Sequence, residues 1–188
     1  MSQRIPRLEM AEFDPRIAEM LKPRVERLKY LGEFFKCTAH VPDVLYHFSQ
    51  MTEALKEALP DRLTEVVALT VACTMDNVYE LHQHERLSVR LGFGEDWVRA
   101  VERCAPDADA SPMADIERVV QRYVLAALAA NGHGADGEFD TVAEALGPSP
   151  AMAVVMLVGR YVAHALIVNT LALAPPVPSV FAEEKAAP

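Results

Sequence analysis

The feature that most limits the fold of this chain is an apolar run from Leu63 to Ala72 that a polar break follows. The side chains of this run leave almost no polar helical face, which is typical of a helix that is buried nearly all round. Glu65 is the exception, an acid inside the apolar run. The sequence therefore predicts that the chain is organised around a buried helix that carries a carboxylate.

A second helix is predicted to begin close to Asn77, after the polar break, and to end at Gly92. Spacings of three and four residues place on one face Asn77, Glu80, Leu81, His84, Leu87, Ser88 and Leu91. The residues that this spacing turns away from that face are His82, Glu85 and Arg86. We therefore expect His84 to point inward and His82 to lie at the surface.

Spacing alone leaves simpler interpretations open for the polar residues of this second helix. Asn77 followed three residues later by Glu80 is a variant of the capping box, which needs no chemistry to explain it. Glu80 and His84 are four residues apart, as in an ordinary pair on a helix surface. An inward histidine is also often a hydrogen-bonded core residue.

The same block resembles the carboxymuconolactone decarboxylase and alkylhydroperoxidase D superfamily, an all-helical group that assembles as oligomers. The residues that carry the resemblance are Arg62-Leu63-Thr64-Glu65, Asn77-Val78-Tyr79-Glu80, His84 and Leu91-Gly92-Phe93. Weaker similarity extends to both ends, through Arg4-Ile5-Pro6-Arg7-Leu8, Val158-Gly159-Arg160-Tyr161 and Asn169. The resemblance implies an all-α, single-domain helical bundle of the alkylhydroperoxidase D type and a homo-oligomer.

Redox members of this superfamily carry Cys-x-x-Cys-x-x-x-His together with an upstream glutamate that relays protons. Asn77 and Glu80 stand at the two cysteine positions of this pattern, and neither residue is a thiol. Cys73 lies four residues before Asn77 and has no cysteine partner at the required spacing. Peroxide reduction by this route needs two thiols, so the chain is more similar to the decarboxylase branch.

The resemblance implies a lyase or isomerase that acts on a small carboxylated lactone or keto acid, with no cofactor. The residues that it assigns to catalysis are Glu65, Glu80 and His84. The residues that it assigns to substrate binding are Asn77, Tyr79 and Arg160. Two alternatives stay open, a non-catalytic helical oligomer that binds a small ligand and a peroxidase activity inherited with the family name.

The composition excludes some classes of partner. The formal net charge is −9 and no cluster of Lys and Arg occurs, so nucleic acid and anionic membranes are not expected partners. The three cysteines have no metal-binding or redox spacing, and His82 and His84 point to different sides of their helix, so we expect no metal site. With no signal peptide in the sequence, we expect a cytoplasmic protein.

The sequence divides into an N-terminal arm at 1–13, a helical domain at 14–173 and a tail of polyproline character at 174–188. The predicted helices other than the central pair are 15–21 and 23–36 (divided by Pro23), 42–59, 94–103, 112–130, 140–146 and 150–173. The last helix is apolar, but Arg160, His164 and Asn169 argue against a membrane span. His40 and His47 are possible pocket residues, although a helix-entry and a surface position are the favoured interpretations, and His133 is predicted to lie in a loop.

Overall fold

A computed structural model of the chain describes residues 5–182, and its regular structure over that range is helical throughout. The predicted all-α class is therefore confirmed. Arg4 of the N-terminal similarity and the end of the predicted tail, 183–188, lie outside the described residues. The elements are η1 (Met10–Glu12), α1 (Pro15–Leu28), α2 (Glu33–Thr38), α3 (Pro42–Glu57), α4 (Asp61–Thr74), α5 (Val78–Arg90), α6 (Glu95–Glu102), α7 (Asp115–Ala129), α8 (Asp136–Leu146) and α9 (Pro148–Thr170).

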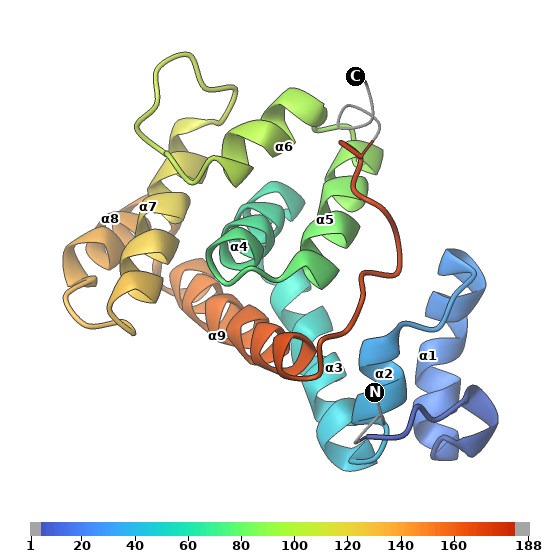
Figure 1. Cartoon of the computed structure of the whole chain (residues 1–188). Coiled ribbons are helices and arrows are strands. Elements are labelled where there is room, and N and C mark those ends of the chain that lie inside the picture. The colour runs from blue at the N-terminus through green and yellow to red at the C-terminus, as the bar shows by residue number, and fades with distance from the viewer. Residues whose placement is uncertain (1–4, 183–188) are drawn as a thin grey trace.

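Helix α4 is the centre of the bundle, as its apolar run predicts. Ten of its 14 residues are buried, and α5, α6, α7 and α9 pack around it (Figure 1). Burial of these aliphatic side chains on all sides of α4 contributes to the hydrophobic stabilisation of the bundle. The large core that results lies between α4, α6, α7 and α9, with Trp97 and Tyr161 among its fully buried side chains.

A second, smaller core lies at the other end of the molecule. It joins the segment before α1 to α1, α2, the start of α3 and the end of α9 through the side chains of Phe13, Ile17, Phe34, Leu45 and Val168, among others. Tyr79 at the start of α5 belongs to this core as well. The seam between the two cores is where the candidate site lies.

The predicted start of α5 is correct, but two residues of the helix differ from their predicted burial. The Asn77 carboxamide oxygen accepts a hydrogen bond from the Glu80 backbone N–H at 3.1 Å, so Asn77 caps the helix. The prediction was wrong for Glu85, which is only 2% exposed, and for Leu91, which is 40% exposed. Spacing within the helix could not reveal a cover that comes from the end of the chain.

That cover is the segment 177–182, which runs back from α9 along α5 toward α6 (Figure 1). The Glu85 carboxylate accepts hydrogen bonds from the Ser179 hydroxyl at 2.6 Å and from the Val180 backbone N–H at 2.8 Å. The Arg86 guanidinium donates to the Pro178 carbonyl at 2.7 Å. The predicted tail is thus packed on the bundle as far as residue 182.

The N-terminal region also differs from its predicted boundaries. Pro23 lies inside α1 and does not divide it, and the helix ends instead at Lys29, whose φ of 65° is left-handed. The arm before α1 lies on α2, where the Leu8 backbone N–H donates to the Lys36 carbonyl at 3.1 Å. The packing of Ile17 and Leu21 in the small core favours one continuous helix across the proline.

Helix α9 is the element, among the described residues, whose length and apolar composition would also suit a membrane span. Half of the most apolar stretch of α9 is buried inside this chain. The side chains of Met152, Met156 and Leu166 are exposed on its outer side.

Candidate active site

A row of buried polar side chains joins α4 to α5 at the predicted positions. The His84 ring holds its Nδ1 atom 2.8 Å from the Glu65 carboxylate and its Nε2 atom 3.2 Å from the Glu80 carboxylate. The Ser88 hydroxyl donates a second hydrogen bond to Glu65 at 3.1 Å. Glu65, Glu80 and His84 are each less than 8% exposed. The structure therefore brings together the three residues that the sequence resemblance assigns to catalysis.

The two carboxylates keep His84 positively charged. Desolvation alone would lower the pKa of His84, but the charge of Glu65 and the hydrogen bonds to both carboxylates outweigh it and raise this pKa to about 9. The Tyr161 hydroxyl lies 3.2 Å from His84 Nε2, and burial raises the pKa of that tyrosine, which stays neutral. The His84 imidazolium at the centre of the row is therefore surrounded by oxygen atoms that can accept hydrogen bonds from its two N–H groups.

The row continues from Glu80 into α9. One oxygen of Glu80 lies 2.9 Å from His164 Nε2 and 3.5 Å from Arg160 Nη1, while the other faces His84. Burial opposes ionisation of Glu80, but the attraction and hydrogen bonds of His164 and His84 hold its pKa well below the usual value. Glu80 is thus a carboxylate that three cationic or hydrogen-bonding side chains share.

His164 differs from His84 in its charge. Burial lowers the pKa of His164, against the opposing attraction of Glu80, so the ring is neutral near pH 7. A neutral ring beside a carboxylate donates from Nε2, which leaves Nδ1 as the acceptor nitrogen. His164 Nδ1 and Arg160 Nη1 are both buried without a hydrogen-bond partner in the structure. Buried polar atoms without a hydrogen-bond partner are rare, and both of these belong to side chains that form ion-pair contacts with Glu80.

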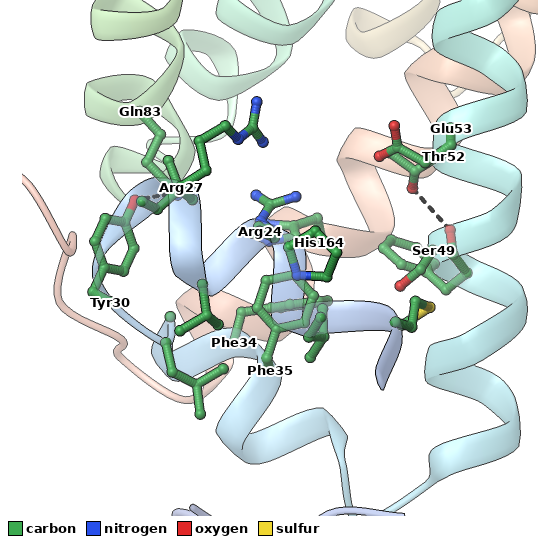
Figure 2. A pocket seen from close by; sticks show the side chains of 18 of the residues that line it. Arg24, Arg27, Tyr30, Phe34, Phe35, Ser49, Thr52, Glu53, Gln83 and His164 are labelled. Atoms are coloured by element: carbon green, nitrogen blue, oxygen red, sulfur yellow. Dashed lines mark hydrogen bonds between the residues drawn. The ribbon is translucent and has the colours of Figure 1, made fainter. Parts of the chain in front are cut away.

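A cavity of about 360 Å³ opens beside this row, between α1, α2, α3, α5 and α9. Figure 2 shows Arg24, Phe34 and His164 around it, with Tyr30 hydrogen-bonded to Gln83 on one side. Its aromatic side chains are Tyr30, Phe34, Phe35, Phe48 and Tyr79, and its basic ones are Arg24, Arg27, Arg160 and His164. An apolar body with an anionic group suits such a lining.

The predicted site residues divide into those that line this cavity and those that do not. Glu80, Tyr79 and Arg160 line it, whereas Glu65 and His84 lie behind Glu80. Asn77 is 1% exposed and does not line the cavity, so its predicted contact with a substrate is corrected. Its carboxamide is instead used to cap α5.

Tyr79 and Arg160 are held in place by contacts outside the row. The Tyr79 hydroxyl accepts a hydrogen bond from the Phe34 backbone N–H at 3.3 Å, which leaves its own proton free to be donated. Arg160 donates from Nε to the Thr52 hydroxyl at 3.1 Å, and its guanidinium lies 4.3 Å from the centre of the Tyr161 ring. Arg160 therefore forms an ion pair with Glu80 and also lines the cavity.

His164 also lines the cavity, and it is not among the site residues that the sequence resemblance assigns. Its spacing of four residues from Arg160 is visible in the sequence, but nothing there shows that both meet Glu80. His40 and His47 are exposed and do not line the cavity, in agreement with the favoured interpretation of each. Among the described residues no group of three or more His, Cys, Asp or Glu is arranged to hold a metal ion.

Residues 42–120 match the model of the Carboxymuconolactone decarboxylase family, and this span contains α4, α5 and three of the side chains of the row. The match covers less than half of the chain, and it is to the family that the sequence resembles. No curated protein matches this chain.

Several solved structures share the fold of this chain. A peroxidase-related protein from Ralstonia eutropha JMP134, described as an alkylhydroperoxidase AhpD core, is 16% identical, with a TM-score of 0.79 over 92% of this chain and 91% of that one. A peroxidase-related protein from Silicibacter sp. TM1040 is 14% identical, with a TM-score of 0.75 over 94% and 95% of the two chains. The debrominase Bmp8, solved as a cysteine-to-alanine variant with 2,3,4-tribromopyrrole, is 14% identical, with a TM-score of 0.72 over 93% and 92%.

Proposed function

We propose that this protein is an acid–base enzyme, a lyase or isomerase that acts on a small carboxylated lactone or keto acid. The observation that supports this most is the position of Glu80, a carboxylate at the cavity wall between two histidines of different charge. Groups whose environments separate their pKa values are the usual basis of acid–base catalysis.

In this proposal the proton is taken by His164 together with Glu80. The neutral ring donates from Nε2 to Glu80, so its Nδ1 lone pair is the proton acceptor. Once protonated, the ring becomes an imidazolium that the carboxylate 2.9 Å away stabilises. His84 and Glu65 do not reach the cavity, and they act as positioning residues that keep Glu80 ionised and oriented.

The substrate carboxylate is held by a positively charged side chain of the cavity. The Arg160 guanidinium binds its carboxylate, since Nη1 has no hydrogen-bond partner in the structure. The Tyr79 hydroxyl donates to the enolate oxygen that forms when the proton leaves, because that hydroxyl accepts from Phe34 and keeps its own proton. The rings of Phe34 and Phe48 contact the apolar part of the substrate.

The test is an assay of CO₂ release and of deuterium exchange from solvent into a panel of lactone and β-keto acids. We expect Glu80→Gln and His164→Gln to lower turnover by about 10²- to 10⁴-fold, the usual contribution of a positioned acid or base. His133→Gln, in an exposed loop, is the matched control and is expected to keep wild-type turnover. Turnover that survives both site substitutions would contradict the proposal, and circular dichroism shows whether a loss reflects unfolding.

The second candidate is a helical oligomer that binds a small ligand without transforming it. Two observations favour it, the apolar side chains that α9 leaves exposed and the aromatic walls of the cavity. It predicts that a carboxylate from the same panel binds with no turnover, and that Arg160→Gln weakens binding while Glu80→Gln does not. Measurable turnover by the wild-type protein would exclude it.

A further inference from the structure

The ring of His164 lies flat against the ring of Phe34 at the wall of the cavity. The two ring centres are 4.2 Å apart and the ring planes are inclined by 25°, which is a stacked arrangement. Both side chains are buried. The Tyr79 ring contacts His164 as well, but it is tilted by 42° and its centre is 5.8 Å away. Of these two rings, Phe34 is therefore the one that packs face to face on His164.

The surroundings of Phe34 hold its ring in place. Phe34 lies in α2, where its ring packs edge-on against Phe35 at 5.3 Å and at a tilt against Phe48 at 5.9 Å between ring centres. Its backbone N–H donates to the Tyr79 hydroxyl at 3.3 Å, and its carbonyl accepts a hydrogen bond from the Thr38 hydroxyl at 2.8 Å. The Phe34 ring belongs to the small core and therefore offers His164 a fixed surface.

The stack limits the orientations that the His164 ring can take. Rotation of this ring about its Cβ–Cγ bond would drive its edge into Phe34, because closely packed rings leave no room for the turn. In the observed orientation Nε2 lies 2.9 Å from the Glu80 carboxylate, and Nδ1 has no hydrogen-bond partner in the structure. Phe34 therefore sets the plane in which the two ring nitrogens lie.

The stack also acts differently on the two charge states of His164. The face of an aromatic ring carries partial negative charge and attracts a cation that lies over it within about 6 Å. This attraction is larger where water is excluded, as it is between two buried rings. A protonated His164 gains this attraction and a neutral one does not.

The charged groups around His164 leave room for such a contribution. The charged or titratable side chains that contact the ring or line the same cavity are Glu80, His84 and Tyr79 of α5, Arg160 of α9, Arg24 and Arg27 of α1, Tyr30 after α1 and Glu53 of α3. Burial and the positive charges of Arg160 and His84 lower the pKa of His164, and the attraction of Glu80 opposes them. The face of Phe34 is a second partner that favours the protonated ring.

We propose that Phe34 is a positioning residue for His164, whose ring holds the imidazole plane in line with Glu80 and stabilises the imidazolium that forms when His164 takes up a proton. The proposal rests on the proposed function only where that proton comes from a substrate. In the substrate-free protein the proton comes from solvent, and the stack acts in the same way.

The test is an NMR titration of the six histidine rings in the whole substrate-free protein. The spectrum of His164→Gln identifies the signals of His164. At pH 7 we expect the ¹⁵N shifts of one neutral tautomer, with its proton on Nε2. Replacing Phe34 with pentafluorophenylalanine nearly keeps the shape of the ring and reverses the charge of its face. We expect this replacement to lower the pKa of His164 by about one unit, a tenfold loss of proton affinity.

A second variant and a matched control separate charge from shape. Phe34→Leu removes the ring and keeps the backbone N–H that donates to Tyr79, so we expect a smaller fall in the pKa of His164. The control is pentafluorophenylalanine at Phe139 of α8, whose ring packs against Tyr123. This control is expected to leave the pKa of His164 at its wild-type value.

A pKa of His164 that does not fall in either variant of Phe34 would overturn the proposal. A wild-type ring with its proton on Nδ1, or one that stays neutral down to about pH 4, would overturn it as well. These signals are read without substrate, so they are independent of turnover that survives Glu80→Gln and His164→Gln, the result that contradicts the proposed function. Where turnover is measured, the acidic limb of its pH profile should move by the same about one unit, whereas a folding defect, checked by circular dichroism, lowers the rate at every pH.

Discussion

The raised pKa of His84 makes a prediction for the pH dependence of stability. A histidine whose pKa is 6.5 in the unfolded chain and about 9 in the folded protein stabilises the fold fully below pH 6.5. This stabilisation is lost as the pH rises through about 9, where the folded protein loses the same proton. The difference between the two pKa values corresponds to about 3 kcal/mol, since one pKa unit is worth about 1.4 kcal/mol. His84 is nearly fully buried, so solvent screens its interaction with the two carboxylates only weakly.

The perturbation is His84→Gln, which keeps a hydrogen-bonding side chain and removes the titration. We expect urea unfolding of the wild-type protein to lose about 3 kcal/mol more than that of the variant between pH 6.5 and pH 9. The comparison cancels the titration of every other group that both proteins share. The variant is expected to be less stable than the wild-type protein at all pH values. The quantity to compare is therefore the slope of the unfolding free energy against pH.

His133→Gln is the control, because this histidine is exposed in a loop and lies outside the acid–base row. If the unfolding free energies of the wild-type protein and of His84→Gln change in parallel between pH 6.5 and pH 9, the reasoning is refuted. The ion pairs of His84 with its two carboxylates would then not stabilise the fold.

Three further predictions concern contacts outside the row. Glu117→Ala removes the acceptor for the Trp97 indole N–H at 2.9 Å and leaves a buried donor unpaired, so we expect a loss of about 3 kcal/mol in urea unfolding. Gly32→Ala places a Cβ atom 2.6 Å from the Tyr79 hydroxyl, so we expect the ring to shift, with a weaker carboxylate affinity by calorimetry and little change in far-UV circular dichroism. Ser179→Ala removes the 2.6 Å hydrogen bond to a buried carboxylate of α5, and faster hydrogen exchange in the segment 177–182 is the expected result.

The parts of the site that sequence could predict are those within one helix or one apolar run. Glu65 stands out because an acid inside a buried helix must meet a partner, and the spacing from Glu80 to His84 fixes their common face. The cap at Asn77 follows from the same local rules. In each case the physical cause lies within a few residues of the side chain that it explains.

The parts that could not be predicted depend on contacts between distant segments. Glu85 is buried because Ser179 and its neighbours cover it, and periodicity within α5 holds no information on that cover. His164 meets Glu80 only because α9 crosses α5 at that level.

The charges at the cavity wall have a consequence for how ligands and protons bind together. Glu80 is balanced by Arg160 and by the imidazolium behind it, while His164 stays neutral. An anion that enters the cavity adds a negative charge beside this neutral ring and favours its protonation. Binding of an anionic ligand should therefore take up a proton from the buffer, and its affinity should fall as the solution becomes more alkaline.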